Sequence, residues 1–132
     1  MNHSVEFILP VLNEEKVLAP SVSTIYNFLD THFKDYNWQI TIADNGSTDK
    51  TAAISEALST KFDRVKHLRI AKKGRGRALK QCWISSESDV VAYMDIDLST
   101  QLDDIRPLLD SITKNNYDLA IGSRLIKGSV VE

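Results

Sequence analysis

The stretch Val90-Val91-Ala92-Tyr93-Met94-Asp95-Ile96-Asp97 decides which fold this chain is expected to adopt. Its first five residues are apolar and rich in β-branched and aromatic types, which is typical of a strand buried on both faces. The run then ends in two carboxylates two residues apart, and alternate side chains of a strand point the same way. Such a pair suits a hard divalent cation shared with the phosphates of a substrate.

Outward from this stretch, short β-rich runs alternate with longer helical patterns along the chain. Alternation of this kind is the signature of βαβ units around a parallel sheet. We therefore predict an α/β domain, a three-layer α/β/α and Rossmann-like arrangement with a mostly parallel sheet. The strands are expected at residues 7–9, 38–43, 65–70, 90–94 and 119–121.

The sequence also indicates where helices begin. Pro20 follows the turn Asn13-Glu14-Glu15 and is tolerated in the first turn of a helix. After the second strand, Ser47 or Thr48 is expected to cap the next helix through its hydroxyl group. A later helix is expected at about residues 103–115.

Composition limits the class of protein. The 132 residues fit one domain, and 42% apolar with 26% charged residues is typical of a soluble globular chain. The net charge of −2 gives no reason to expect nucleic acid as a partner. Cys82 is the one cysteine, which fits a reducing, cytoplasmic setting. Because Glu6 interrupts the first apolar stretch, we expect no signal peptide, and no segment reaches the roughly 20 apolar residues of a membrane span.

Polar or glycine-containing loops follow the predicted strands. Open parallel sheets bind ligands at the carboxyl ends of their strands. Several such loops at one edge are unusual for a purely structural domain, so we predict a binding site there. The loops are residues 10–14, 44–47, 72–77, 95–97 and 122–124.

Two acidic positions have a structural and a functional interpretation. Asp95 and Asp97 could form a solvated turn. Their position directly after a buried strand instead favours a metal-binding role, in which Mg²⁺ or Mn²⁺ stabilises a diphosphate as a leaving group. The segment from Asp44 to Asp49 is most simply a turn followed by a helix cap. Asp44, as the first residue past its strand, could also accept a hydrogen bond from a nucleobase or ribose.

The basic positions also leave alternatives open. Gly74-Arg75-Gly76 lacks the third glycine of a dinucleotide fingerprint and follows the third strand rather than the first. Glycines beside Lys73 at the start of a helix suit a phosphate, because free N–H groups and positive charge converge there. A solvated basic loop is the alternative. Arg124 is either a phosphate contact or an exposed loop charge.

Taken together, these segments resemble the donor-binding half of the inverting family 2 glycosyltransferases, which have the GT-A fold. The likeness lies in the ordered set of motifs, which are Phe7 to Glu15, Ala43 to Thr51, Gly74 to Leu79 and Asp95 to Asp97. Within the family, Asp97 to Thr100 and Gly122 to Gly128 are most similar to enzymes that move mannose or glucose to a polyprenyl or dolichyl phosphate. The resemblance implies a hexosyltransferase at the cytoplasmic face of a membrane.

The resemblance also implies roles for individual residues. Asp95 and Asp97 would hold Mg²⁺ or Mn²⁺, and Asp97 and Arg124 would serve catalysis. Asn45 replaces the family's usual second Asp, which removes a charged contact at that position. The donor, a UDP- or GDP-hexose, would be bound by Pro10, Leu12, Glu14, Asp44, Asn45, Gly46, Lys73, Gly74, Arg75, Gly76, Asp95 and Ile96.

Family members continue past the point that corresponds to Glu132 with an acceptor-binding half and, in many, membrane-associated segments. By this comparison residues 1–124 form the nucleotide-sugar-binding domain, and residues 125–132 begin a truncated acceptor-side segment. We therefore expect these 132 residues to bind the donor but not, alone, to transfer sugar to the lipid phosphate. Peripheral membrane contact would come from the missing C-terminal part.

Two other functions agree with parts of the sequence. An aspartate-type phosphatase has a nucleophile loop similar to Asp95-x-Asp97-x-Ser99, but there the loop follows the first strand. A nucleotide-binding or interaction domain could keep the fold without catalysis. An aspartyl-phosphate intermediate would indicate the first alternative, and a transfer assay separates the second from an enzyme.

Overall fold

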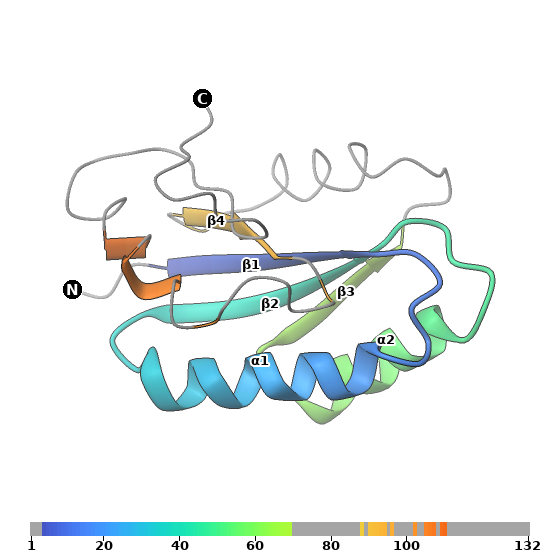
Figure 1. Cartoon of the computed structure of the whole chain (residues 1–132), viewed down its shortest axis with the longest axis horizontal. Coiled ribbons are helices and arrows are strands. Elements are labelled where there is room, and N and C mark those ends of the chain that lie inside the picture. Colours follow the sequence, from blue (N-terminus) through green and yellow to red (C-terminus); the bar gives the residue numbers. More distant parts are fainter. Residues whose placement is uncertain are drawn as a thin grey trace.

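The computed structural model describes residues 4–69, 88, 90–94, 96, 102, 105–107 and 109–110. In this part four strands form one sheet in which all pairs are parallel, and two helices lie on one side of it (Figure 1). The predicted α/β class with a parallel sheet is thus confirmed. In chain order the elements are β1 (Ser4–Val11), α1 (Leu18–His32), β2 (Asn37–Asp44), α2 (Thr51–Lys61), β3 (Val65–Arg69) and β4 (Val90–Tyr93).

The strand order is β3-β2-β1-β4, so the chain changes direction across the sheet between β1 and β4. In open α/β sheets, ligands bind at such a reversal, outside the carboxyl ends of the strands. The register aligns the ends of three strands, because Val11 of β1 pairs with Asp44 of β2, and Asp44 pairs with Arg69 of β3. The carboxyl edge therefore brings these three residues side by side.

The main core lies between the sheet and the two helices. Alternate residues of β1 face this core, from Val5 to Val11, and α1 contributes fully buried apolar side chains at helical spacing. A second cluster on the opposite face includes Ile8 and Tyr93. Burial on both faces explains why β1 and β4 are nearly continuous apolar runs. No helix in the described residues is long and apolar enough to cross a bilayer.

Pro10 lies inside β1, paired with Ala43, rather than beyond the strand as predicted. The sheet tolerates this proline because of where its nitrogen points. The carbonyl of Ile8 accepts a hydrogen bond from the N–H of Met94 on the β4 side, and Pro10 faces the same side two residues later. Pairing of β1 with β4 ends at Ile8 and Tyr93, so the absent N–H interrupts no strand pairing.

The predicted cap of α2 is wrong. Lys50 precedes the helix and makes no side-chain capping bond. Neither Ser47 nor Thr48 directly precedes the helix, which begins at Thr51, and the Ser47 hydroxyl oxygen accepts a hydrogen bond from the N–H of Asn13, 34 residues earlier. Pro20, in contrast, lies in the first turn of α1 as predicted.

Arg106 connects the segment 105–110 to the residues that follow α1. Its guanidinium donates to both carboxylate oxygens of Asp35 and to the carbonyl of His32, and it lies 4.6 Å from the centroid of the Phe33 ring. The described residues of this segment are helical, as the sequence predicts for 103–115. The predicted strand 119–121 and the helix after the basic loop lie outside the described residues.

Candidate functional site

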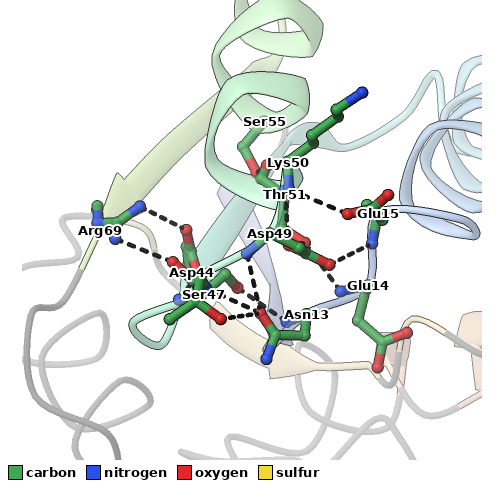
Figure 2. Close-up of polar contacts among 11 residues, drawn as sticks. Asn13, Glu14, Glu15, Asp44, Ser47, Asp49, Lys50, Thr51, Ser55 and Arg69 are labelled. Atoms are coloured by element: carbon green, nitrogen blue, oxygen red, sulfur yellow. Dashed lines mark hydrogen bonds and ion pairs between the residues drawn. The ribbon is translucent and has the colours of Figure 1, made fainter.

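The loops that follow β1 and β2 are joined at the carboxyl edge of the sheet (Figure 2). Asn13 is central to this junction, with a φ of 52° in the left-handed region that Asn tolerates better than most residues. Its N–H donates to the Ser47 hydroxyl oxygen over 2.9 Å. Its side-chain oxygen accepts hydrogen bonds from the backbone N–H groups of Thr48 and Asp49, at 2.8 and 3.3 Å. One amide group therefore organises the turn before α2.

Further hydrogen bonds extend the junction along both loops. The N–H of Glu14 donates to the Thr51 hydroxyl over 2.8 Å, and the N–H of Glu15 donates to Asp49 Oδ2 over 3.3 Å. In return, the N–H of Lys50 donates to Glu15 Oε1. Because the bonds run in both directions, the two loops hold each other at a defined distance.

Asp49 is the acceptor that joins the helix start to this network. Its Oδ1 accepts hydrogen bonds from both the N–H and the hydroxyl of Thr51. Desolvation raises the pKa of Asp49, but the hydrogen bonds from Thr51 and Glu15 outweigh it and lower the pKa below the ordinary value of 3.8. Asp49 is therefore a carboxylate at neutral pH, and its oxygens are used to hold the two loops and the start of α2 together.

Asp44 is the most deeply buried charged residue of the edge, with 1% exposure. The N–H of Ser47 donates to its Oδ1 over 2.9 Å. Its Oδ2 lies 3.5 Å from Nη1 of Arg69, and Nη2 of Arg69 donates to the Ser47 carbonyl over 3.0 Å. Figure 2 shows Arg69 reaching from the end of β3 toward both residues. The carboxylate is thus oriented by one backbone donor and one cation.

Two buried side-chain oxygens at the end of β2 accept no hydrogen bond from the described residues, although one of them, Asp44 Oδ2, is ion-paired with Arg69. Asp44 Oδ2 and Asn45 Oδ1 have no hydrogen-bond partner within the described part of the chain. The backbone N–H of Asn45 donates to the Val11 carbonyl, which continues the pairing of β1 and β2 by one step. Gly46 then turns the chain with a φ of 84°, a value that favours glycine. Unpaired buried acceptors are costly, so these oxygens are candidates for ligand contacts.

An open pocket of about 400 Å³ lies beside the junction, lined by Asn13, Glu14, Glu15, Lys16, Val17 and Asp49. Three carboxylates and one lysine give it a negative charge. Figure 2 shows the Glu14 carboxylate pointing away from the other labelled side chains. Leu12 and Val17, each 39% exposed, are the exposed large apolar residues of the described chain.

Six of the predicted site residues lie together at this edge: Pro10, Leu12, Glu14, Asp44, Asn45 and Gly46. Ile96 is buried in the main core with 4% exposure, so its side chain serves packing. The other predicted residues, Lys73, Gly74, Arg75, Gly76, Asp95, Asp97 and Arg124, lie outside the described residues. Their roles, and a divalent metal, stay predictions; the described residues contain no group of three or more metal-ligating side chains.

Sequence reasoning did not assign the residues that build the junction: Asn13, Ser47, Asp49, Thr51 and Arg69. Arg69 lies near the end of the strand expected at residues 65–70, but its partner Asp44 follows only from the register of β2 and β3, in which the two side chains share a face of the sheet. For the others the signal was weak, since Asn, Ser, Asp and Thr are frequent in any turn.

The chain is similar to known proteins over nearly its whole length. The sequence model described as "Glycosyl transferase family 2" matches residues 6–131. The chain is 33% identical over 129 residues to a dolichol-phosphate mannosyltransferase of Pyrococcus furiosus, covering 97% of the chain and 35% of that protein. It is 27% identical over 129 residues to glycosyltransferase AglD of Haloferax volcanii, with 97% and 21% covered. It is 26% identical over 126 residues to dolichyl-phosphate beta-glucosyltransferase ALG5C of Trichomonas vaginalis, covering 89% of the chain and 37% of that protein. The chain therefore spans well under half the length of these relatives.

Proposed function

Because this chain belongs to glycosyl transferase family 2, we propose that it forms the donor-binding part of a hexosyltransferase. The donor would be a nucleotide-diphospho-hexose, and the acceptor a polyprenyl or dolichyl phosphate attacked with inversion at the anomeric carbon. The names of two relatives, a dolichol-phosphate mannosyltransferase and a dolichyl-phosphate beta-glucosyltransferase, support this acceptor.

The observation that carries the proposal is the arrangement of the carboxyl edge. The junction of the two loops and the buried Asp44 lie at the ends of β1 and β2, next to the reversal of strand order. On the other side of β1 lies β4, which the sequence continues into Asp95 and Asp97. A nucleoside over β1 and β2 would thus have its diphosphate directed toward the acidic pair.

The chemistry can be divided among these groups. Asp44 would accept a hydrogen bond from the nucleoside, and Asp95 with Asp97 would hold Mg²⁺ or Mn²⁺ at the diphosphate. The metal would supply charge neutralisation of the leaving group. A phosphate monoester has a second pKa of about 6, so the acceptor is largely ionised at neutral pH and needs little help from a general base.

Two alternative functions, an aspartate-type phosphatase and a domain without catalysis, have less support from these observations. In the phosphatases considered above, the nucleophile loop follows the first strand, whereas Asp95 and Asp97 follow β4, the fourth described strand. The match to the glycosyltransferase family over residues 6–131 also argues against a phosphatase. A domain of this family without catalysis has the same fold, so only a transfer assay distinguishes it.

Calorimetry tests the donor site. We expect UDP-glucose or GDP-mannose to bind in the presence of Mn²⁺ and to bind more weakly in EDTA. Without a cation between them, the negative charges of the diphosphate and of the Asp95 and Asp97 carboxylates repel each other. Asp97→Ala or Asp95→Ala should weaken binding about tenfold or more. His67→Ala, an exposed position in β3, is the control and should bind as the wild type does. Equal affinity in EDTA and Mn²⁺ would contradict the metal site.

A transfer assay tests the reaction. Radiolabelled mannose or glucose from the donor that binds should appear in a glycosyl-phospholipid when the natural full-length protein meets dolichyl phosphate. Loss of product in the Asp97→Ala protein would assign the reaction to this site. Donor binding by the full-length protein without any product would instead support a domain that has lost catalysis.

A further inference from the structure

Three consecutive backbone N–H groups in the loop between β1 and α1 are bonded to side chains of the next loop. In chain order, the N–H groups of Asn13, Glu14 and Glu15 donate to the Ser47 hydroxyl over 2.9 Å, the Thr51 hydroxyl over 2.8 Å and Asp49 Oδ2 over 3.3 Å. Successive N–H groups in a turn commonly form a concave site for an anion. Here oxygens of the protein already accept from them, so this loop does not offer these N–H groups to a phosphate of the nucleotide.

Two of the three acceptors are hydroxyl groups that a ligand cannot reach. Ser47 is 2% exposed and Thr51 is 0% exposed. Their other polar groups are also used within the protein. The N–H of Ser47 donates to Asp44 Oδ1, and Thr51 donates its N–H and its hydroxyl to Asp49 Oδ1. Any effect of these two hydroxyls on ligand binding therefore acts through the backbone that they hold.

Glu14 is the residue whose position the two hydroxyls define. Thr51 holds the N–H of Glu14, and Ser47 holds the N–H of the preceding residue, Asn13. The Glu14 carboxylate points away from the other labelled side chains (Figure 2), and Glu14 lines the open pocket. The junction thus fixes the backbone of Glu14 and directs its side chain outward.

We propose that Thr51 and Ser47 are positioning residues of the donor site, whose buried hydroxyls hold the loop of Glu14 in place without touching the ligand. This inference rests on the proposed donor-binding function, in which Glu14 contacts the nucleotide, and deepens it by naming the residues that act through Glu14. A loop that is held before the ligand arrives loses less conformational freedom on binding. Without one hydroxyl, the loop populates other positions, and the apparent affinity falls with the fraction that is correctly placed.

A purely structural role for the two hydroxyls predicts a different result. A ligand that binds only the folded chain has the same Kd for every variant that is fully folded and has an intact site, whatever its stability. A folded variant that loses affinity has therefore lost something local to the site. Arg106 offers the comparison, because it contacts Asp35 and Phe33 at the end of α1 opposite the junction.

An isosteric substitution tests the inference on the full 132-residue chain. Calorimetry in Mn²⁺ measures the Kd of UDP-glucose and of GDP-mannose, and the tighter ligand is then used for the variants. Thr51→Val replaces the hydroxyl by a methyl group of similar size. We expect binding about 3- to 30-fold weaker, as for residues that act on a site without touching its ligand. Thr51→Ser keeps the hydroxyl and should bind as the wild type does.

A double substitution shows whether the hydroxyl acts through Glu14. In a Glu14→Ala chain, Thr51→Val should cause little further loss of affinity, because the side chain that it positions is absent. Ser47→Ala removes a single oxygen atom and should weaken binding of the wild-type chain in the same way, so it carries the test if Thr51→Val does not fold. Arg106→Met is the matched control, which should lower stability and leave the Kd unchanged. Thermal unfolding establishes that each variant is folded at the temperature of the binding measurement.

The outcomes separate this inference from the function beneath it. Folded Thr51→Val and Ser47→Ala chains that bind as tightly as the wild type would overturn the positioning role and leave the donor-binding function intact. A Thr51→Val loss that is just as large in the Glu14→Ala chain, or an equal loss in Arg106→Met, would also overturn it. Absence of binding of both nucleotide sugars to the wild-type chain would contradict the proposed function itself.

Discussion

Replacing Asn13 with alanine should destabilise the fold by about 2 kcal/mol. The side-chain oxygen accepts two backbone hydrogen bonds, from Thr48 at 2.8 Å and Asp49 at 3.3 Å. Since both are exposed, each falls at the low end of the 0.5–1.5 kcal/mol range, for about 1 kcal/mol together. Asn13 also has a φ of 52°, and holding alanine in this region costs about 1 kcal/mol more.

Urea unfolding of the wild type and the variants measures this value directly. Asn13→Asp is the matched control, because aspartate keeps an acceptor oxygen and tolerates the same backbone conformation; it should lie within about 0.5 kcal/mol of the wild type. An alanine variant as stable as the wild type would refute the reasoning, and so would an aspartate variant as damaged as alanine. The first result would mean that the Asn13 amide is dispensable to the junction.

Two further predictions follow from other described contacts. The pKa of Asp49 should lie below 3.8 in the folded chain, so its contribution to stability is present above the unfolded pKa and is lost as the pH falls through the folded pKa. An NMR titration should show this, with Thr51→Val moving the pKa back up and Thr51→Ser leaving it low; titration of wild-type Asp49 at or above 3.8 would contradict the prediction. Arg106→Met should lower the free energy of unfolding by about 1 kcal/mol through loss of the Asp35 and Phe33 contacts. Arg106→Lys should recover only part of it in urea unfolding, because lysine lacks the planar fork, and full recovery would argue against bidentate geometry.

Much of the fold could be predicted from local patterns. The run Val90–Tyr93 is apolar at every position because both faces of the sheet are buried, and a strand of that kind belongs in a parallel sheet. Boundaries were less predictable. The β1 strand runs to Val11 although Pro10 suggested an earlier end, since the effect of a missing N–H depends on which neighbour it faces.

Part of the candidate site could likewise be predicted from the sequence, and part of it could not. Asp44 could be predicted because a charge directly after an apolar strand is conspicuous in sequence. Its burial, and the pairing with Arg69, could not, since they depend on the neighbouring strand and its register. Ser47 was predicted to cap a helix because hydroxyl residues often do so close to their own position. Its actual partner is 34 residues away, and no local rule anticipates such a contact.

The sequence by itself determined the class of fold, the family and the sheet edge at which the polar loops gather, because these depend on hydrophobic periodicity and on the order of motifs along the chain. The tertiary structure decided which side chains meet at that edge. Strand order and register bring Val11, Asp44 and Arg69 into line, and the loop junction connects residues 34 to 37 positions apart. The physical reason is that periodicity specifies which face a residue occupies, whereas the partner it finds there depends on how distant segments pack.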